Sequence, residues 1–219
     1  MLPPIARRQS PWRSVAEPMR QVVKLGGSYA DSPQLPQVLD RLAGQAGRQL
    51  VIVPGGGPFA DTVRHWQQRW RFADPVAHPM ALAAMIQYGL MLTGLQPKLA
   101  TADSLAAIES IWQQGRIPVW LPVELLDDRD AVEASWQVTS DSLALWLADR
   151  LGAEQLVLLK SVSAPPFDAT VAELTRREIV DQAFAGFAAR SQCEVYCLGP
   201  DQALCFDCEC CPGTLITTR

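Results

Sequence analysis

Short apolar runs alternate with stretches of helical periodicity along most of the chain. Runs of about five aliphatic and β-branched residues predict buried strands, and apolar residues recurring every three or four positions predict helices between them. This alternation indicates βαβ units, so we predict an α/β fold: a three-layer αβα sandwich with a mostly parallel open sheet. The predicted strands are 21–25, 49–53, 117–121, 155–160, 194–198 and 215–217, and the predicted helices are 34–45, 58–70, 76–92, 103–115, 140–151 and segments between 169 and 190.

The chain divides into a short N-terminal stretch and one long segment that carries the alternating pattern. Residues 1–20 contain prolines and arginines but no apolar run, which predicts a flexible N-terminal extension and no secretory signal. Residues 21–219 contain no repeat or low-complexity linker, so we predict one domain there. The most apolar stretch, 79–95, includes polar residues and two glycines, which favours a buried helix over a membrane span. Helical periodicity alone leaves open whether this helix packs in the core or between subunits.

Composition narrows the classes of partner and the compartment. A net charge of −4 argues against a broad nucleic-acid surface, while a small anionic substrate needs only a few placed cations. Six cysteines without an export signal predict a reducing cytoplasm. Cys205, Cys208 and Cys210 have spacing that suits zinc or redox chemistry, but their crowding into one segment favours ordinary reduced thiols. With only two histidines, His65 and His78, we predict a packing or hydrogen-bonding role for each and no metal site in the protein.

Two glycine-rich turns follow predicted strands, and their pairing is the strongest chemical feature of the sequence. Gly26-Gly27-Ser28 ends the first strand, and Gly55-Gly56-Gly57 ends the second. Glycine lets backbone N–H groups wrap an anion without interference from Cβ, and a helix N-terminus behind the loop adds a partial positive charge. Ligands of open parallel sheets gather at the carboxyl ends of the strands. The two turns therefore predict two anionic groups held face to face.

Charged residues at neighbouring strand and helix ends complete the candidate site. Lys24 precedes the first glycine turn, and Lys160 ends a buried strand. A phosphoryl group in transfer carries dispersed negative charge that requires cations placed in advance. Asp141, at a predicted helix start, either caps that helix or holds the two ammonium groups in position. We predict that Lys24, Asp141 and Lys160 are catalytic.

Several other catalytic or nucleotide-binding motifs are absent or fit poorly. The order of lysine and glycines differs from a P-loop, and no G-x-S-x-G is present. Residues 55–60 fit the dinucleotide fingerprint G-x-G-x-x-A, with Asp74 at a suitable distance for the ribose. However, Asp74 follows a helical stretch rather than a second strand, and an oxidoreductase would leave Lys24 and the first glycine turn unexplained.

Four short motifs follow one another along the chain: 23–28, 53–57, 139–142 with Ala144, and 212–216. In this order they resemble the motifs of the amino acid kinase family, which includes acetylglutamate, aspartate and uridylate kinases. The resemblance implies the amino acid kinase fold, ATP with Mg²⁺, and a homo-oligomer, either a dimer or larger. One departure concerns residues 160–166, which lack the usual glycine and aspartate and leave the nucleotide preference open.

The resemblance also implies roles for individual residues. Asp141 is expected to orient the two lysines. The residues expected to bind ATP and its phosphates are Lys24, Gly26, Gly27, Ser28, Lys160 and Ser161, and those expected to bind the acceptor are Gly55, Gly56, Gly57, Asp61, Arg64 and Ser140.

Further stretches are similar to the branch of this family that phosphorylates an (aminomethyl)furanyl-methyl phosphate for methanofuran assembly. They are 55–64, 78–81, 87–89 and 135–141. In this interpretation Arg64 meets an acceptor phosphate and Asp61 an acceptor amine, or both are solvated helix residues. Alternatives are a kinase of the same fold with a nucleoside monophosphate or amino-acid carboxylate as acceptor, and a non-catalytic protein that binds nucleotides or oxyanions.

Overall fold

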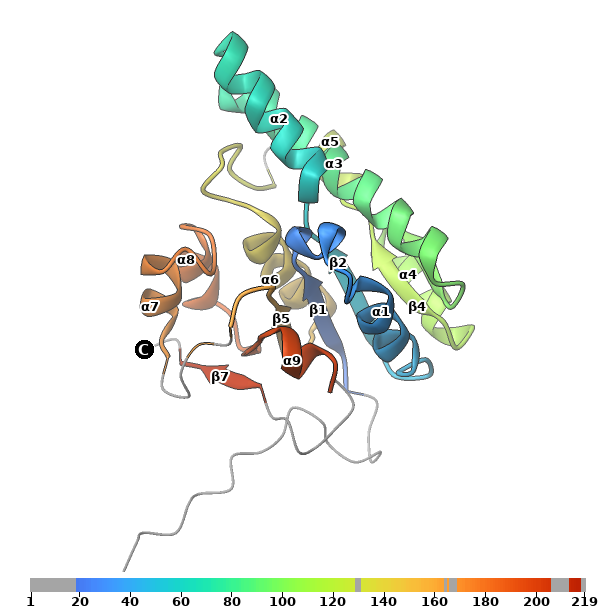
Figure 1. The fold of residues 1–219 in the computed structure, drawn as a ribbon. Coiled ribbons are helices and arrows are strands. Elements are labelled where there is room, and N and C mark those ends of the chain that lie inside the picture. The colour runs from blue at the N-terminus through green and yellow to red at the C-terminus, as the bar shows by residue number, and fades with distance from the viewer. Residues whose placement is uncertain (1–18, 129–130, 164, 166–168, 206–212, 218–219) are drawn as a thin grey trace, which may run out of the picture.

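A seven-stranded sheet with the order β3-β4-β2-β1-β5-β6-β7 forms the centre of the molecule (Figure 1). The computed structural model describes residues 19–128, 131–163, 165, 169–205 and 213–217. All strand pairs are parallel except β6 with β7, so the predicted mostly parallel open sheet is confirmed. The strands are β1 Gln21–Leu25, β2 Leu50–Pro54, β3 Leu99–Ala102, β4 Ile117–Trp120, β5 Gln155–Leu159, β6 Glu194–Leu198 and β7 Thr214–Ile216.

Helices cover both faces of the sheet and enclose two apolar cores. One core lies between the sheet and α4, α6, α7 and α8, and the other lies against α1 and α9. Helix α3 contributes side chains to both. These two cores are the reason the central strands are apolar throughout, since both faces are buried. The helices are η1 Gly27–Asp31 (3₁₀), α1 Leu35–Ala43, α2 Gly57–Trp70, α3 Asp74–Leu95, α4 Leu105–Gln113, α5 Glu124–Asp127, α6 Ser140–Leu151, α7 Val171–Arg176, α8 Phe184–Ala188 and α9 Pro200–Ala203.

Element boundaries differ from the prediction where local chemistry intervenes. Strand β3 was not predicted, because it has only four residues and only two of them are buried. Helix α4 begins two residues later than expected, since Ser104 caps it by accepting from the backbone N–H of Ala107 at 3.3 Å. The helical segments predicted between 169 and 190 are α7 and α8, and Glu178 between them has a left-handed φ of 55°.

Helix α3 is a core helix, although it is long and apolar enough by composition to cross a bilayer. Its inner face buries Leu82, Met85 and Leu92 against the sheet, as the sequence predicts. Val76 and Leu90 on its outer face are each 52% exposed. The buried face therefore accounts for part of the apolar character of this segment, and exposed apolar side chains on the outer face supply the rest.

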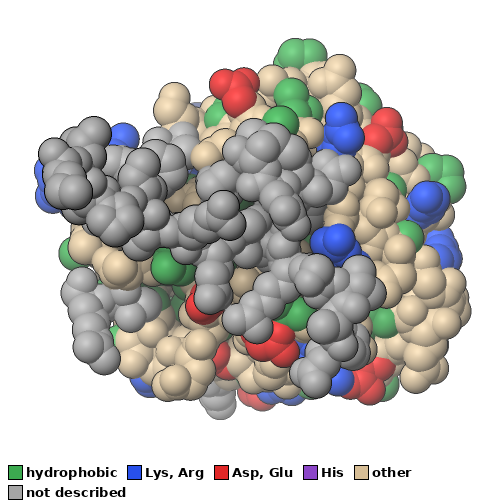
Figure 2. Space-filling view, turned by 90° about the horizontal axis from the view of Figure 1, so that it is seen from below, with side chains coloured by type: hydrophobic (Ala, Val, Ile, Leu, Met, Phe, Trp, Pro, Cys, Tyr) green, Lys and Arg blue, Asp and Glu red, His purple; other side chains and the backbone are tan. Residues whose placement is uncertain are grey.

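The surface carries charges of both signs. On the face shown in Figure 2, lysines and arginines are interspersed with acidic side chains over the part that is described, without a continuous basic area there. This distribution agrees with the net charge of −4.

Two sequence predictions fall on residues outside the description. The predicted extension lies there except for its last two residues, and so do Cys208, Cys210 and Cys211. Among the described cysteines, Cys193, Cys197 and Cys205 are free thiols, and the first two are buried. The cysteine-rich segment therefore remains a sequence-level prediction.

Candidate active site

The two glycine turns touch each other through backbone atoms. Strands β1 and β2 are parallel neighbours in register, with Lys24 opposite Val53, so both turns emerge at the same edge of the sheet. A Cβ on Gly27 would lie 2.3 Å from the backbone nitrogen of Gly57, and a Cβ on Gly55 would lie 2.4 Å from that of Gly27. Neither position accepts a side chain, because the obstructing atoms are backbone. The two turns therefore lie together at one edge of the sheet, while the two anionic groups predicted for them stay a prediction.

Gly56 and Gly57 also start helix α2 under steric constraint. Gly57 has a positive φ of 54°, a conformation that L-amino-acid side chains rarely adopt. A Cβ on Gly56 would lie 2.4 Å from the Cβ of Ala60, one turn later in the helix. The glycines thus allow a strand, a tight turn and a helix N-terminus to follow one another within a few residues, with backbone N–H groups at the turn.

Lys24, Asp141 and Lys160 come together beside these turns. Side chains alternate along a strand, so Lys24 shares the face of Val22, which packs in the core formed with α6. Its Nζ lies 3.0 Å from Oδ1 of Asp141 in the first turn of α6. The Nζ of Lys160, which follows β5, lies 2.7 Å from Oδ1 and 2.9 Å from Oδ2 of the same carboxylate. One buried carboxylate therefore holds two ammonium groups, which is the arrangement the sequence suggested.

Burial sets the protonation behaviour of this cluster. Desolvation lowers the pKa of Lys24 to about 8, although the negative charge of Asp141 acts in the opposite direction. Burial alone would raise the pKa of Asp141, but the ammonium groups of Lys160 and Lys24 bring it below its ordinary value. Asp141 is consequently ionised at neutral pH, and Lys24 is the group in this cluster that loses its charge at mildly alkaline pH.

Hydrogen bonds join the first glycine turn to the segment after β5. The backbone N–H of Gly26 donates to the carbonyl of Leu159 at 3.0 Å. The hydroxyl of Tyr29 donates to the carbonyl of Lys160 at 3.2 Å. Ser28 and Ser161 share a hydrogen bond between their hydroxyl groups. The residues predicted for the ATP side are thereby brought into one place.

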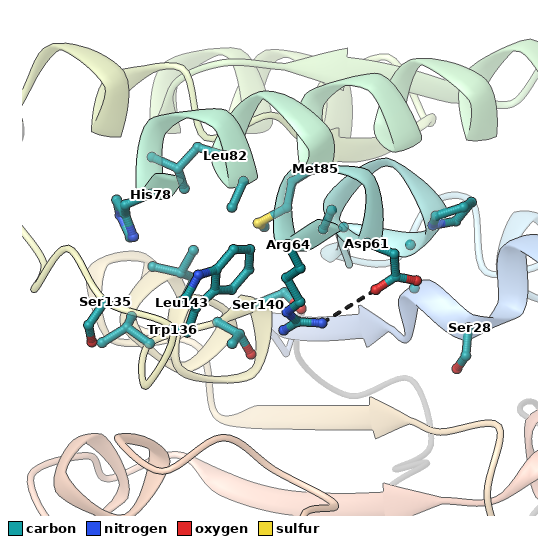
Figure 3. Close-up of a pocket in the computed structure, with 18 of the residues that line it drawn as sticks. Ser28, Asp61, Arg64, His78, Leu82, Met85, Ser135, Trp136, Ser140 and Leu143 are labelled. Carbon is teal, nitrogen blue, oxygen red and sulfur yellow. Dashed lines mark hydrogen bonds and ion pairs between the residues drawn. The ribbon is translucent and has the colours of Figure 1, made fainter. Parts of the chain in front are cut away.

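A cavity of about 410 Å³ opens on the other side of the glycine contact (Figure 3). Helices α2 and α3 form one wall, and the segment from Ser135 into the first turns of α6 forms the other. Gly56, Gly57, Asp61, Arg64 and Ser140, five of the six residues predicted for the acceptor, line it, while Gly55 lies at the glycine contact instead. Ser28 and Gly27, predicted for ATP, line it as well, so they lie at the junction of the two sides.

Aromatic and polar residues that sequence reasoning left without a role complete the cavity. The Arg64 guanidinium lies 4.4 Å from the centroid of the Trp136 ring and 3.4 Å from Oδ1 of Asp61 (Figure 3). The indole N–H of Trp136 donates to Gln67. Trp136 stood inside a motif noted in the sequence, but only the folded chain places it against Arg64.

His78 also lines the cavity. Burial lowers its pKa, and its enclosed Nε2 has no hydrogen-bond partner within the described part of the chain. The sequence predicted a packing or hydrogen-bonding role, and its position in the wall was not predictable from local pattern. Asp31 and Asp74 also line the cavity, although the sequence had pointed to Asp74 only as the acidic residue of a dinucleotide fingerprint.

Comparisons with known proteins agree with this geometry. Residues 19–164 match the amino acid kinase family. The chain is 29% identical over 142 residues to [5-(aminomethyl)furan-3-yl]methyl phosphate kinase from Methanocaldococcus jannaschii, and the match spans 64% of this chain and 65% of that relative.

Solved structures of low sequence identity share the fold. Uridylate kinase from Archaeoglobus fulgidus superposes with a TM-score of 0.65 at 17% identity, covering 85% of this chain and 94% of that one. UMP kinase from Bacillus anthracis gives a TM-score of 0.66 at 17% identity, with 92% and 97% covered.

Proposed function

Because the chain belongs to the amino acid kinase family, we propose that it transfers the γ-phosphoryl group of ATP to a small anionic acceptor. The observation that carries this proposal is the pair of ammonium groups on Asp141, placed beside two glycine turns in backbone contact. Cations fixed in a buried, pre-organised position stabilise the charge that develops during phosphoryl transfer. Since the charges are already held by Asp141, little reorganisation is needed when the reaction occurs.

On the donor side, Lys24, Lys160 and the backbone N–H groups of Gly26 and Gly27 would meet the phosphates. Ser28 and Ser161 would contribute hydroxyl groups. Asp141 would orient the lysines without accepting a proton, because both its oxygens already accept from ammonium groups. ATP supplies the transferred phosphoryl group when it is bound.

Mg²⁺ fits this site as a companion of the ATP phosphates. Among the described residues, no group of three or more His, Cys, Asp or Glu side chains is placed to hold a metal ion. Mg²⁺ commonly keeps several waters and binds substrate phosphates with only one or two carboxylates. The protein residues would therefore position the phosphates rather than form a cage for the ion.

On the acceptor side, we propose an (aminomethyl)furanyl-methyl phosphate, which would become its diphosphate in methanofuran-type cofactor biosynthesis of one-carbon metabolism. The relative from M. jannaschii supports this choice. In the cavity, Arg64 and the amides at Gly56 and Gly57 suit an acceptor phosphate, and Trp136 offers a flat surface to a ring. Asp61 suits an amine.

We further propose that the protein acts in the cytoplasm and as a homo-oligomer.

The uridylate kinase fold of its structural neighbours favours, as a second candidate, a nucleoside monophosphate acceptor for the same cavity.

The test is acceptor-dependent release of ADP, with the aminomethylfuran phosphate, UMP and an amino-acid carboxylate offered in parallel. We expect a product heavier by one phosphoryl group from the furan compound. The Lys24→Ala variant should lose about a hundred- to a thousandfold in rate. Lys98→Ala is the matched control, because Lys98 is exposed and lies outside the site.

Each contrary result has a separate meaning. Turnover with UMP alone would assign the second candidate. ATP binding without ADP release for any acceptor would indicate a non-catalytic nucleotide-binding protein. Equal rates for Lys24→Ala and Lys98→Ala would refute the role given to Lys24.

A further inference from the structure

Asp181 caps a helix that lies forty residues earlier in the sequence. Helix α6 begins after Thr139, whose own side chain does not cap the helix. The Oδ2 of Asp181 accepts from the backbone N–H of Thr139 at 2.9 Å, from the Thr139 hydroxyl at 2.8 Å and from the backbone N–H of Ser142 at 3.0 Å. Its Oδ1 accepts from the Ser142 hydroxyl. One carboxylate thus accepts from two backbone N–H groups and two hydroxyl groups at the start of α6.

These hydrogen bonds surround the aspartate that holds the lysines. Thr139 and Ser142 flank Asp141 in the chain, so fixing both of them fixes the backbone from which the Asp141 side chain projects. A helix start left without its cap frays, and the carboxylate of Asp141 would then move relative to Lys24. The geometry of the ammonium pair accordingly depends on a residue that touches neither lysine through a described hydrogen bond.

Asp181 also joins the two sides of the site. It belongs to the segment that follows Lys160, while Thr139 lines the acceptor cavity. Close by, the backbone N–H of Ala183 donates to the carbonyl of Gln137 at 3.0 Å. The donor-side segment is therefore attached to the cavity wall at the point where α6 starts.

We propose that Asp181 is a positioning residue for the phosphoryl transfer: by fixing the start of α6, it holds the carboxylate of Asp141 in place against the ammonium group of Lys24. This inference rests on the proposed function for its catalytic meaning. Its structural part, the effect of Asp181 on the surroundings of Lys24, can be tested in the protein without substrate.

The charges around Lys24 define the expected pH effect. Asp141 in α6 contacts Lys24 directly, and the other groups whose charge acts on it are Lys160 at the end of β5 and Asp181 before α8, with the Cys197 thiol of β6 in the same electrostatic environment. Burial lowers the pKa of Lys24 to about 8, and the negative charges of Asp141 and Asp181 oppose that decrease. Burial raises the pKa of Cys197 to about 12, so its thiol stays neutral near pH 8. Removing the charge of Asp181 should lower the pKa of Lys24 further.

The experiment uses Asp181→Asn in the full chain, which keeps the shape of the side chain and removes its charge. Lys24, Lys98 and Lys160 are the only lysines in the sequence, so a protein labelled with ¹³C at lysine Cε gives three signals to titrate by NMR. Lys24→Arg identifies the Lys24 signal, and the exposed Lys98 serves as reference. We expect the Lys24 midpoint to fall by about 0.5 pH unit or more in Asp181→Asn, with the Lys98 signal unchanged. An unchanged Lys24 midpoint would overturn the proposal.

Kinetics provide the second measurement. Activity requires the ammonium form, which is lost as pH rises through the pKa of Lys24, so the alkaline limb of the pH–rate profile should move to lower pH in Asp181→Asn. We expect kcat to fall by about tenfold at pH 7.5, more than KM for ATP changes, because the phosphates still meet the glycine turns. A change confined to KM would contradict a positioning role.

Two variants separate this role from ordinary loss of a cap. Ser104→Ala removes the side-chain cap of α4 far from the site, and it should lower the melting temperature without moving the Lys24 signal. Ser142→Ala removes one hydroxyl donor but leaves the Asp181 charge, so the Lys24 midpoint should stay in place. A Lys24 shift in Ser104→Ala equal to that in Asp181→Asn would refute the assignment.

The NMR titration needs no substrate, which keeps the two proposals apart. If no acceptor is phosphorylated while Asp181→Asn still moves the Lys24 midpoint, the proposed function fails and the positioning role of Asp181 stands. If phosphorylation occurs and the Lys24 midpoint stays fixed, the opposite conclusion follows.

Discussion

The proposed acceptor side and the proposed donor side of this site are built from different kinds of groups. Backbone atoms of Gly27 and Gly57 touch between the two sides, and long helices enclose the acceptor cavity. On the donor side, charged side chains from β1, α6 and the end of β5 meet, and a fourth, from before α8, caps α6 next to them. The spacing between the two sides is therefore a property of the backbone, while the charge that acts on the phosphoryl group is a property of side chains. Substitutions should separate these two contributions.

The largest effect is expected from Asp141→Asn, which removes the charge at the centre of the donor side. The two ammonium groups would then face each other, and burial would lower the pKa of Lys24 without opposition from Asp141. Breaking a buried ion pair typically costs about 3–5 kcal/mol of stability. We expect a fall in kcat of about a hundredfold or more, measured by ADP release, with a lower melting temperature. Asp149→Asn, in the same helix but away from the lysines, is the control.

Gly27→Ala should affect both the donor side and the acceptor side of the site. The new Cβ would lie 2.3 Å from the backbone nitrogen of Gly57, so the two turns must separate. We expect a loss of about 1–3 kcal/mol in the free energy of unfolding, and weaker binding of both ATP and the acceptor by calorimetry.

The matched control for this glycine is Gly94→Ala, where a Cβ meets open space near the end of α3. It should stabilise the protein by about 0.5–1 kcal/mol. Unchanged stability and binding in Gly27→Ala would show that the backbone contact does not set the spacing of the two sides.

The smallest effect is expected from Trp136→Leu, which alters only the acceptor wall. It removes the ring beneath the Arg64 guanidinium, an interaction of about 0.5–2 kcal/mol. KM for the acceptor should rise several-fold while KM for ATP stays the same. Trp70→Leu, on a residue 67% exposed and outside the cavity, is the control. An equal rise in both KM values would show that the two sides are not separable here.

The fold was largely predictable because its information is local. Apolar runs identified every strand except β3, and β1 and α6 were predicted at their observed bounds. The short β3 was missed because its four residues are too few for periodicity and are stabilised by pairing with β4. Pairing partners are not encoded in the strand itself.

The site was predictable to the extent that each residue adjoined a recognisable turn. Lys24, Asp141 and Lys160 each lie at an element end, and the folded chain brings them together as the sequence suggested. Trp136 and Asp181 come from loops whose composition gives no indication of their neighbours. Asp181 caps a helix across forty residues of chain, and only the tertiary packing of α8 on α6 determines that contact. Long-range caps of this kind leave no mark in local sequence.

The backbone contact between Gly27 and Gly57 has a consequence for the history of such enzymes. Since no side chain spans that junction, the cavity walls formed by α3 and residues 135–140 are free to change without altering the distance over which the phosphoryl group travels. Substitutions in the cavity wall can therefore change which acceptor binds, one residue at a time, while the distance between the two glycine turns stays the same. A family of enzymes that keeps the two glycine turns can therefore come to use different acceptor substrates while the phosphoryl-transfer step stays the same.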